Sequence, residues 1–207
     1  MKSMMKKALL LLMAALMLPA LSACAGEARQ DREPEMYIEP AQLNEDEEKM
    51  AQLLGGMDGQ HIFDFSVDDS VQSLRIKLWK LEDGEWTDWQ ADRQMLTEGS
   101  GRIALGFDDI TAGCRIAVQT QSDFSASSGS READEALEGM GRTTAYLPQR
   151  REIEYDKEIA LAIQTFTDKN EVISYDPEYF EHPEEYEKLG YEGVFAITAC
   201  FSQEPLS

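Results

Sequence analysis

The sequence SLRIKLWKLEDGEWTDWQ, residues 73–90, combines two patterns that predict a β-hairpin. Apolar and charged residues alternate from Leu74 to Leu78, which is the period of two of a strand with one face on a core. Asp83-Gly84 then supplies a two-residue hairpin turn into a second strand. We expect the rest of the fold to extend this antiparallel pair.

Similar strand patterns recur on both sides of the hairpin. They are HIFDFSV (61–67), RIALGF (102–107), CRIAVQT (114–120), TTAYL (143–147), EIALAIQTF (158–166) and GVFAITACF (193–201). The last two are apolar on both faces, so we expect them to be central. Because helices do not alternate regularly with strands, the sequence predicts a mainly β protein, an antiparallel β-sandwich of about eight strands with short peripheral helices. A barrel is the alternative.

Three segments between the strands carry helix or loop signals. Residues 45–54 follow Asn44, a good N-terminal cap, and predict a short helix. Residues 122–141 are rich in serine, glycine and acids, and predict a long mobile loop with one short helical turn. In residues 176–190, proline and glycine positions predict two short helical turns.

The N-terminus has the layout of an export signal. Three lysines precede an unbroken apolar run from Ala8 to Leu18, and small residues follow. A run of this length is well short of the roughly 18–20 residues that span a bilayer. We therefore expect the segment to be cleaved, and an N-terminal anchor helix is the less favoured alternative.

The quartet Leu21-Ser22-Ala23-Cys24 resembles the lipobox of bacterial lipoproteins. The resemblance implies cleavage before Cys24 and attachment of a lipid, such as palmitate, to this residue. Two or three acyl chains give a durable anchor, since each buried CH₂ adds about 0.8 kcal/mol. The predicted location is the extracytoplasmic side of a bacterial cell membrane, inner or outer. An ordinary secretory signal is the alternative.

Composition and charge set the domain plan. We assign residues 1–23 to a signal peptide, 24–41 to the lipidated cysteine and a flexible tether, and 42–207 to a single β-sandwich domain. The chain has a net charge of −21, and removal of the signal makes it three units more negative. Such a chain is expected to repel nucleic acid and anionic lipid headgroups, and to remain soluble and monomeric. Membrane contact is expected through the lipid alone.

Catalytic signatures are scarce. The chain contains no HExxH, CxxC, P-loop or GxSxG motif. His61 and His182 are far apart, so we expect each to be a surface or capping residue. The pairs Asp68-Asp69 and Asp108-Asp109 fall in predicted turns, where calcium binding is an alternative to simple solubility. From sequence we assign no catalytic residue, no metal ligand and no cofactor.

Three tryptophans and two cysteines are the remaining candidates. Trp86 and Trp89 are three apart in a predicted strand, so one is expected to point inward and the other outward. Together with Trp79 they are candidates for ligand contact, with sheet packing as the alternative. Cys114 and Cys200 either form a disulfide, worth about 4–5 kcal/mol, or remain buried thiols.

These features favour a membrane-anchored lipoprotein that acts as a binding or interaction module for a protein or a glycan. A structural or accessory subunit of an envelope complex is the first alternative, and a glycan hydrolase is the less favoured one. A binding module predicts an exposed apolar groove that holds at least one tryptophan. An enzyme predicts a concave pocket of carboxylates or histidine with shifted pKa values.

Overall fold

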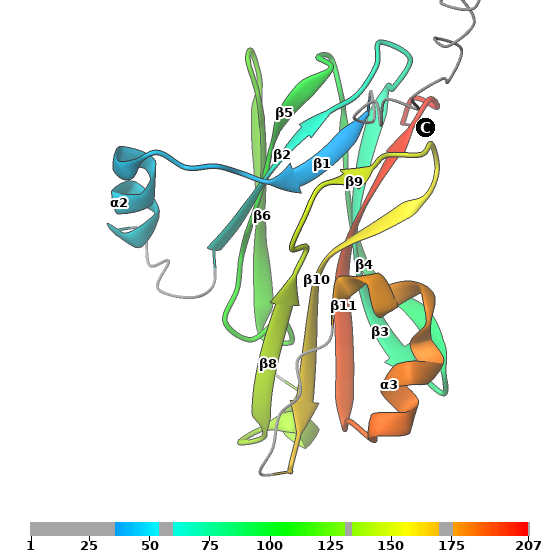
Figure 1. Ribbon diagram of the computed structural model, residues 1–207. Helices are drawn as coiled ribbons and strands as arrows, with labels where there is room; N and C mark the ends of the chain where they lie inside the picture. Colours follow the sequence, from blue (N-terminus) through cyan, green and yellow to red (C-terminus); the bar gives the residue numbers. More distant parts are fainter. Residues whose placement is uncertain (1–35, 54–59, 131–133, 170–175, 207) are drawn as a thin grey trace, which may run out of the picture. The chain divides into compact units, whose positions relative to one another are not determined.

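The computed structural model describes residues 36–53, 60–130, 134–169 and 176–206, all within one compact unit. They form two antiparallel sheets that share an apolar core, so the predicted β-sandwich is confirmed (Figure 1). The six-stranded sheet has the order β7-β6-β5-β2-β1-β9, and the five-stranded sheet the order β4-β3-β11-β10-β8.

The strand bounds are as follows. The six-stranded sheet contains β1 (Tyr37–Pro40), β2 (Gln60–Ser66), β5 (Ser100–Gly106), β6 (Gly113–Thr120), β7 (Phe124–Ser130) and β9 (Arg151–Glu152). The five-stranded sheet contains β3 (Ser73–Glu82), β4 (Glu85–Met95), β8 (Gly141–Tyr146), β10 (Glu158–Thr167) and β11 (Gly193–Ser202). The helical segments are α2 (Glu45–Leu53), η2 (Glu135–Leu137), η3 (Pro177–Glu181) and α3 (Pro183–Leu189).

The predicted hairpin is present as β3 and β4. Asp83 and Gly84 adopt φ angles of 51° and 80°, as a tight hairpin turn requires at both central positions. Leu74, Ile76 and Leu78 are buried in the core between the sheets. The two strands predicted to be apolar on both faces, β10 and β11, lie in the interior of the five-stranded sheet.

Strand β7 corrects the sequence interpretation, because it lies inside the stretch predicted as a mobile loop. It pairs with β6 over its whole length. Its sequence FSASSGS lacks the apolar alternation of a strand, since its inward-facing residues are two serines and a glycine. Ser125 donates to Gln94 of β4 and Ser127 to Asp92, so hydrogen bonds replace apolar contacts where the two sheets meet. With β1 and β9, the described residues form eleven strands.

Strand β1 corrects the predicted tether of residues 24–41. Residues Tyr37–Pro40 pair with both β2 and β9, and Ile38 is fully buried in the core. The sandwich therefore begins before the predicted boundary at Gln42. Cys24 and the predicted signal peptide of residues 1–23 lie outside the described residues.

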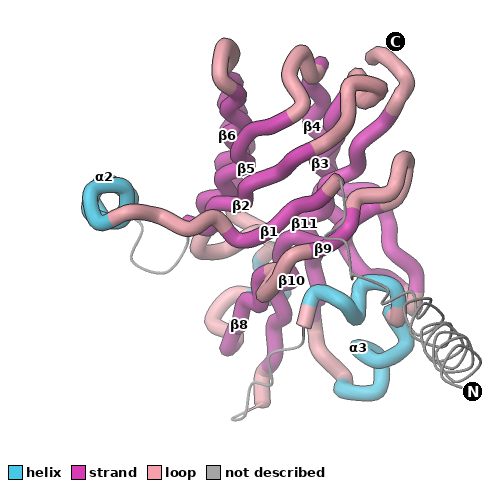
Figure 2. The backbone as a smooth tube through the Cα atoms, turned by 45° about the horizontal axis from the view of Figure 1, so that its top comes forward, coloured by secondary structure: helices cyan, strands magenta, loops and turns pink. Residues whose placement is uncertain are grey.

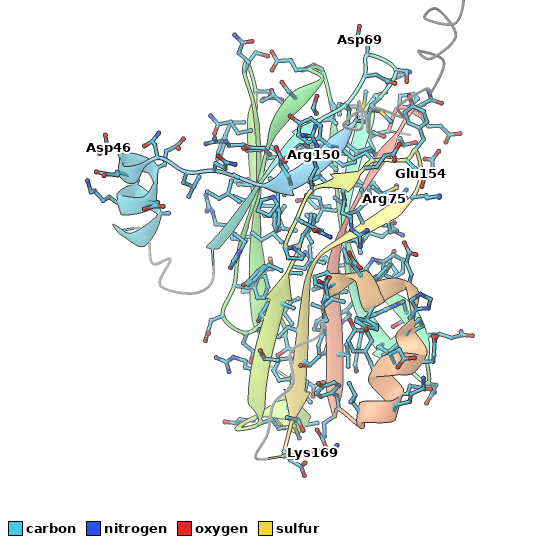
Figure 3. The ribbon with its side chains drawn as sticks, viewed as in Figure 1. Asp46, Asp69, Arg75, Arg150, Glu154 and Lys169 are labelled. Atoms are coloured by element: carbon cyan, nitrogen blue, oxygen red, sulfur yellow. The ribbon has the colours of Figure 1, made fainter. Side chains whose placement is uncertain are left out.

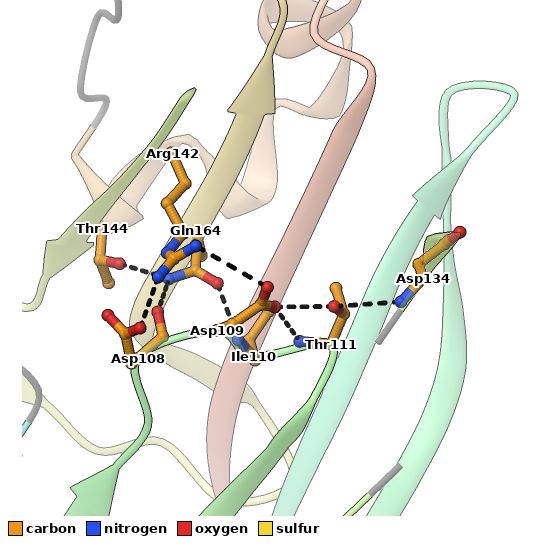
Figure 4. Close-up of polar contacts among 8 residues, drawn as sticks. All are labelled: Asp108, Asp109, Ile110, Thr111, Asp134, Arg142, Thr144 and Gln164. Carbon is orange, nitrogen blue, oxygen red and sulfur yellow. Dashed lines mark hydrogen bonds and ion pairs between the residues drawn. The ribbon is translucent and has the colours of Figure 1, made fainter. Parts of the chain in front are cut away.

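A buried glutamine joins the two sheets (Figure 4). The side-chain amide of Gln164 in β10 donates to the Asp108 carbonyl at 2.9 Å and to Thr144 at 2.8 Å, and its carbonyl accepts from the Ile110 N–H at 2.8 Å. Arg142 of β8 forms an ion pair with Asp108. These contacts fix the β5–β6 loop of one sheet on strands of the other.

The short helices form as predicted and border different sheets (Figures 1 and 2). Helix α2 begins with a capping box, in which Asn44 accepts from the Glu47 N–H while Glu47 accepts from the Asn44 N–H. It lies beside the six-stranded sheet. Helices η3 and α3 contact the outer face of the five-stranded sheet, and Gly190 ends α3 in the left-handed conformation.

Candidate binding groove

A row of apolar side chains, most of them alanines, crosses the outer face of the six-stranded sheet. Ile62, Ala104, Ala117 and Ala126 are directly paired across β2, β5, β6 and β7. The adjacent residues along these strands point inward, most of them into the core and, at Ser125 and Ser127, onto β4, so these four face outward. The alanines are short, and the next row on one side, which consists of Asp64, Arg102, Gln119 and Phe124, is bulkier.

Helix α2 lies beside this row of side chains and is held there by one arginine. Arg102 of β5 binds Glu47 of α2 and Asp64 of β2, both at 2.7 Å. Two hydrogen bonds lower the pKa of Glu47: the one from the Asn44 N–H has the larger effect, and the one from Arg102 the smaller. Glu47 therefore stays ionised, and the same carboxylate both caps the helix and fastens it to the sheet.

The space between α2 and the sheet is an open groove of about 360 Å³, which we call the α2 groove. Its lining is Leu43, Glu47, Met50, Ala51, Ile62, Arg102, Ala104, Leu105, Gly106, Arg115, Ala117 and Phe124. Met50 and Phe124 remain 56% and 61% exposed, although both are large apolar side chains. An apolar concavity with a few polar groups at its margin is the usual form of a binding site.

The three tryptophans lie elsewhere. Trp89 points inward and packs on Phe195 with ring centroids 5.0 Å apart, whereas Trp86 lies on the outer face and stacks on Phe180 of η3 at 4.8 Å. The two rings therefore lie on opposite faces, as predicted for a strand without a bulge. Strand β4 nevertheless has a bulge beside Trp89, and Trp86 is covered by η3 and does not point to solvent. Trp79 also lies on the outer face, 6.0 Å from Phe180. None of the three lines the α2 groove.

The outward tryptophans are engaged in packing. The Trp86 indole N–H donates to the Phe180 carbonyl at 2.8 Å, and the Trp79 N–H donates to Thr198 at 2.8 Å. Both rings border the second core cluster beneath η3 and α3. The geometry therefore favours the sheet-packing interpretation over ligand contact, and the expected groove with a tryptophan is replaced by one walled by Met50 and Phe124.

The two cysteines of the sandwich are free thiols. Cys114 packs against the core between the sheets, and burial raises its pKa to about 12. Cys200 is on the outer face of β11, where Arg75 donates to its sulfur at 3.1 Å, and burial raises its pKa. Both thiols are thus held protonated, which disfavours a nucleophilic role.

The histidines do not share a site. His182 is exposed and separates η3 from α3. His61, predicted as a surface residue, is instead half-buried and stacks on Tyr146 with centroids 3.2 Å apart. Burial lowers the pKa of His61, so the folded protein favours the neutral ring.

This lowered pKa predicts a pH-dependent stability. Below the ordinary value of 6.5 the unfolded chain binds a proton at His61 that the folded chain does not, so stability falls as pH falls. In His61→Phe, which keeps a ring against Tyr146, this contribution is absent. We measure the free energy of unfolding of both proteins at pH 7.5 and at pH 5.5. We expect the wild type to lose more stability than the variant when the pH is lowered. A stability difference between the two proteins that is equal at both pH values would contradict the assignment.

The acidic turns are organised by hydrogen bonds within the chain. Asp68 accepts from the N–H and hydroxyl of Ser70 and from Tyr155, and the Ser70 hydroxyl is the largest cause of its lowered pKa. Asp109 accepts from the N–H and hydroxyl of Thr111. Among the described residues, no three His, Cys, Asp or Glu side chains are grouped to hold a metal ion.

A second concavity, of about 200 Å³, lies beneath η3 and is lined mainly by charged side chains. Arg151 pairs there with Glu178, and Lys157 with Glu154 at 2.6 Å. Figure 3 marks its Glu154 and the nearby Arg75 far from Asp46 of α2, so the two concavities are separate. Glutamates outnumber basic residues in its lining, and both basic residues, Arg151 and Lys157, are already paired with glutamates of the chain. The concavity is therefore acidic and lacks the apolar surface of the α2 groove.

No protein-family model, curated protein or solved structure matches this chain. Within the described part of the chain, no helix is both long and apolar enough to cross a membrane. The function must therefore be inferred from the chain's own residues.

Proposed function

We propose that this chain is a lipid-anchored protein of a bacterial envelope, held by Cys24 on the extracytoplasmic side, whose β-sandwich binds an apolar segment of a partner protein in the α2 groove. The supporting observation is the groove itself. Met50 and Phe124 border it and are each more than half exposed on a chain that is otherwise strongly acidic. An exposed apolar groove costs solubility and is typical of an interaction site.

A protein segment fits the groove better than a glycan does. Sugar rings stack on exposed aromatic planes, and Phe124 is the one aromatic ring among the described lining residues, since the three tryptophans are packed in the sandwich or beneath η3. The α2 groove is walled mainly by aliphatic side chains and Met50, whose flexible thioether adapts to apolar partners of different shape. The anchor would keep this groove close to other proteins of the same membrane.

Photo-crosslinking tests this proposal. A benzophenone amino acid is placed at Met50 of the full chain in bacterial cells, and a matched control at Met95, a 45% exposed methionine of β4 outside the groove. We expect a discrete protein adduct at position 50, at least about tenfold stronger than at position 95, since only position 50 faces the occupant. Equal adducts at both positions, or none at position 50, would contradict the proposal.

A further inference from the structure

Strand β7 forms an unusually unprotected sheet edge. Of the strands that end the two described sheets, β4 carries several charges, β8 carries Arg142 and β9 consists of Arg151 and Glu152. In contrast, β7 has the sequence FSASSGS, without charge or proline, and its register with β6 has no bulge. Natural proteins normally protect such edges against the addition of another strand.

The unpaired backbone groups of β7 follow from its hairpin geometry. The Thr120 N–H donates to the Asp123 carbonyl at 2.9 Å, so this pair is hydrogen-bonded. Alternation along an antiparallel ladder then directs the N–H and C=O groups of Phe124, Ala126 and Ser128 away from β6. The side chain of Asp123 accepts from the Phe124 N–H at 2.8 Å. The backbone N–H and C=O groups of Ala126 and Ser128 have no partner among the described residues.

The same three residues connect this edge to the α2 groove. Phe124 lines the groove, and Ala126 ends the row of apolar side chains that forms its floor. Ser128 is paired with Arg115, which also lines the groove. Arg115 is exposed and has no ion pair with any described residue. A strand added to β7 would therefore place one more side chain at the end of each cross-strand row, beside Phe124, Ala126 and Ser128.

We propose that the partner segment adds to β7 as an extended strand, with an apolar side chain beside Phe124 and a carboxylate facing Arg115; this inference rests on the proposed function of the groove. Phe124 and Ser128 are four positions apart, so the apolar and acidic residues of the partner are also separated by four. A second copy of this chain fits less well, because its β7 offers serines and no carboxylate to Arg115.

Two synthetic peptides provide the test. Each is a nine-residue, fluorescein-labelled peptide of alternating threonine and valine in which one residue is replaced by phenylalanine. The residue four positions away from this phenylalanine is glutamate in one peptide and lysine in the other. Binding to the full chain and to Arg115→Glu is measured by anisotropy. We expect the wild type to prefer the glutamate peptide about fivefold or more, and Arg115→Glu to prefer the lysine peptide. Equal affinities in both proteins would overturn the carboxylate assignment.

Two NMR measurements on the peptide complex separate strand addition from groove binding. They are the hydrogen exchange of the backbone amides of β7 and the chemical shift of the Met50 methyl group. With bound peptide, strand addition predicts slower hydrogen exchange at Ala126 and Ser128, with no change at Ser125 and Ser127, which already face β6. A shifted Met50 signal without protection at Ala126 and Ser128 would overturn strand addition and leave the groove proposal standing. Protection without a shift at Met50 would instead support strand addition and count against the groove. Absence of any binding would overturn both.

Discussion

Replacing Gln164 by leucine is expected to lower the free energy of unfolding by about 3 kcal/mol. Gln164 is 1% exposed and makes three hydrogen bonds to the β5–β6 loop and β8. Leucine has a similar volume, so little cavity forms, but the Ile110 N–H and the Asp108 carbonyl lose their partner. Leaving buried polar groups unpaired is costly, and here it also releases a loop that joins the two sheets.

Urea unfolding of Gln164→Leu and of a matched control, Gln119→Leu, measures this effect. Gln119 is a glutamine of β6 with an exposed side chain, so its replacement should change stability by less than about 0.5 kcal/mol. A loss below 1 kcal/mol in Gln164→Leu, on the order of the control, would show that the amide network is not what fixes the loop.

Replacing Cys24 by serine is expected to abolish membrane attachment completely. A serine hydroxyl forms no thioether, and without acyl chains the acidic chain has no anchor at the bilayer once its leader is cleaved. In fractionated cells we expect the wild type in the membrane pellet and Cys24→Ser in the soluble fraction. Cys114→Ala is the control, since Cys114 lies within the sandwich core and should leave the anchor intact. Equal membrane fractions for wild type and Cys24→Ser would contradict the assignment.

Local signals predicted the fold well wherever one short stretch determined the outcome. Apolar alternation and Asp83-Gly84 gave the β3–β4 hairpin, and Asn44 and Gly190 marked helix ends. Strand β7 was missed for a physical reason, because its inward positions are polar or lack a side chain, and two of them, Ser125 and Ser127, bind β4. Its strand conformation depends on tertiary hydrogen bonds, which local periodicity does not encode.

The α2 groove was harder to predict, because it depends on register. Ile62 and Ala126 share a row only when β2, β5, β6 and β7 are paired as observed, and a slip of one residue would turn the row inward. One signal was present: Ala104 and Ala117 occupy outward positions of strands where polar residues are usual. The tryptophans gave the more conspicuous pattern, but the sheet and η3 bury much of their surface.

The proposed location of this protein depends on lipid attachment at Cys24. The mass of the N-terminal peptide, from protein isolated from its native membrane, tests this attachment most directly. We expect the mature chain to begin at Cys24 and to carry the added mass of a thioether-linked diacylglycerol. A free Cys24 thiol, or a chain that still begins at Met1, would contradict it.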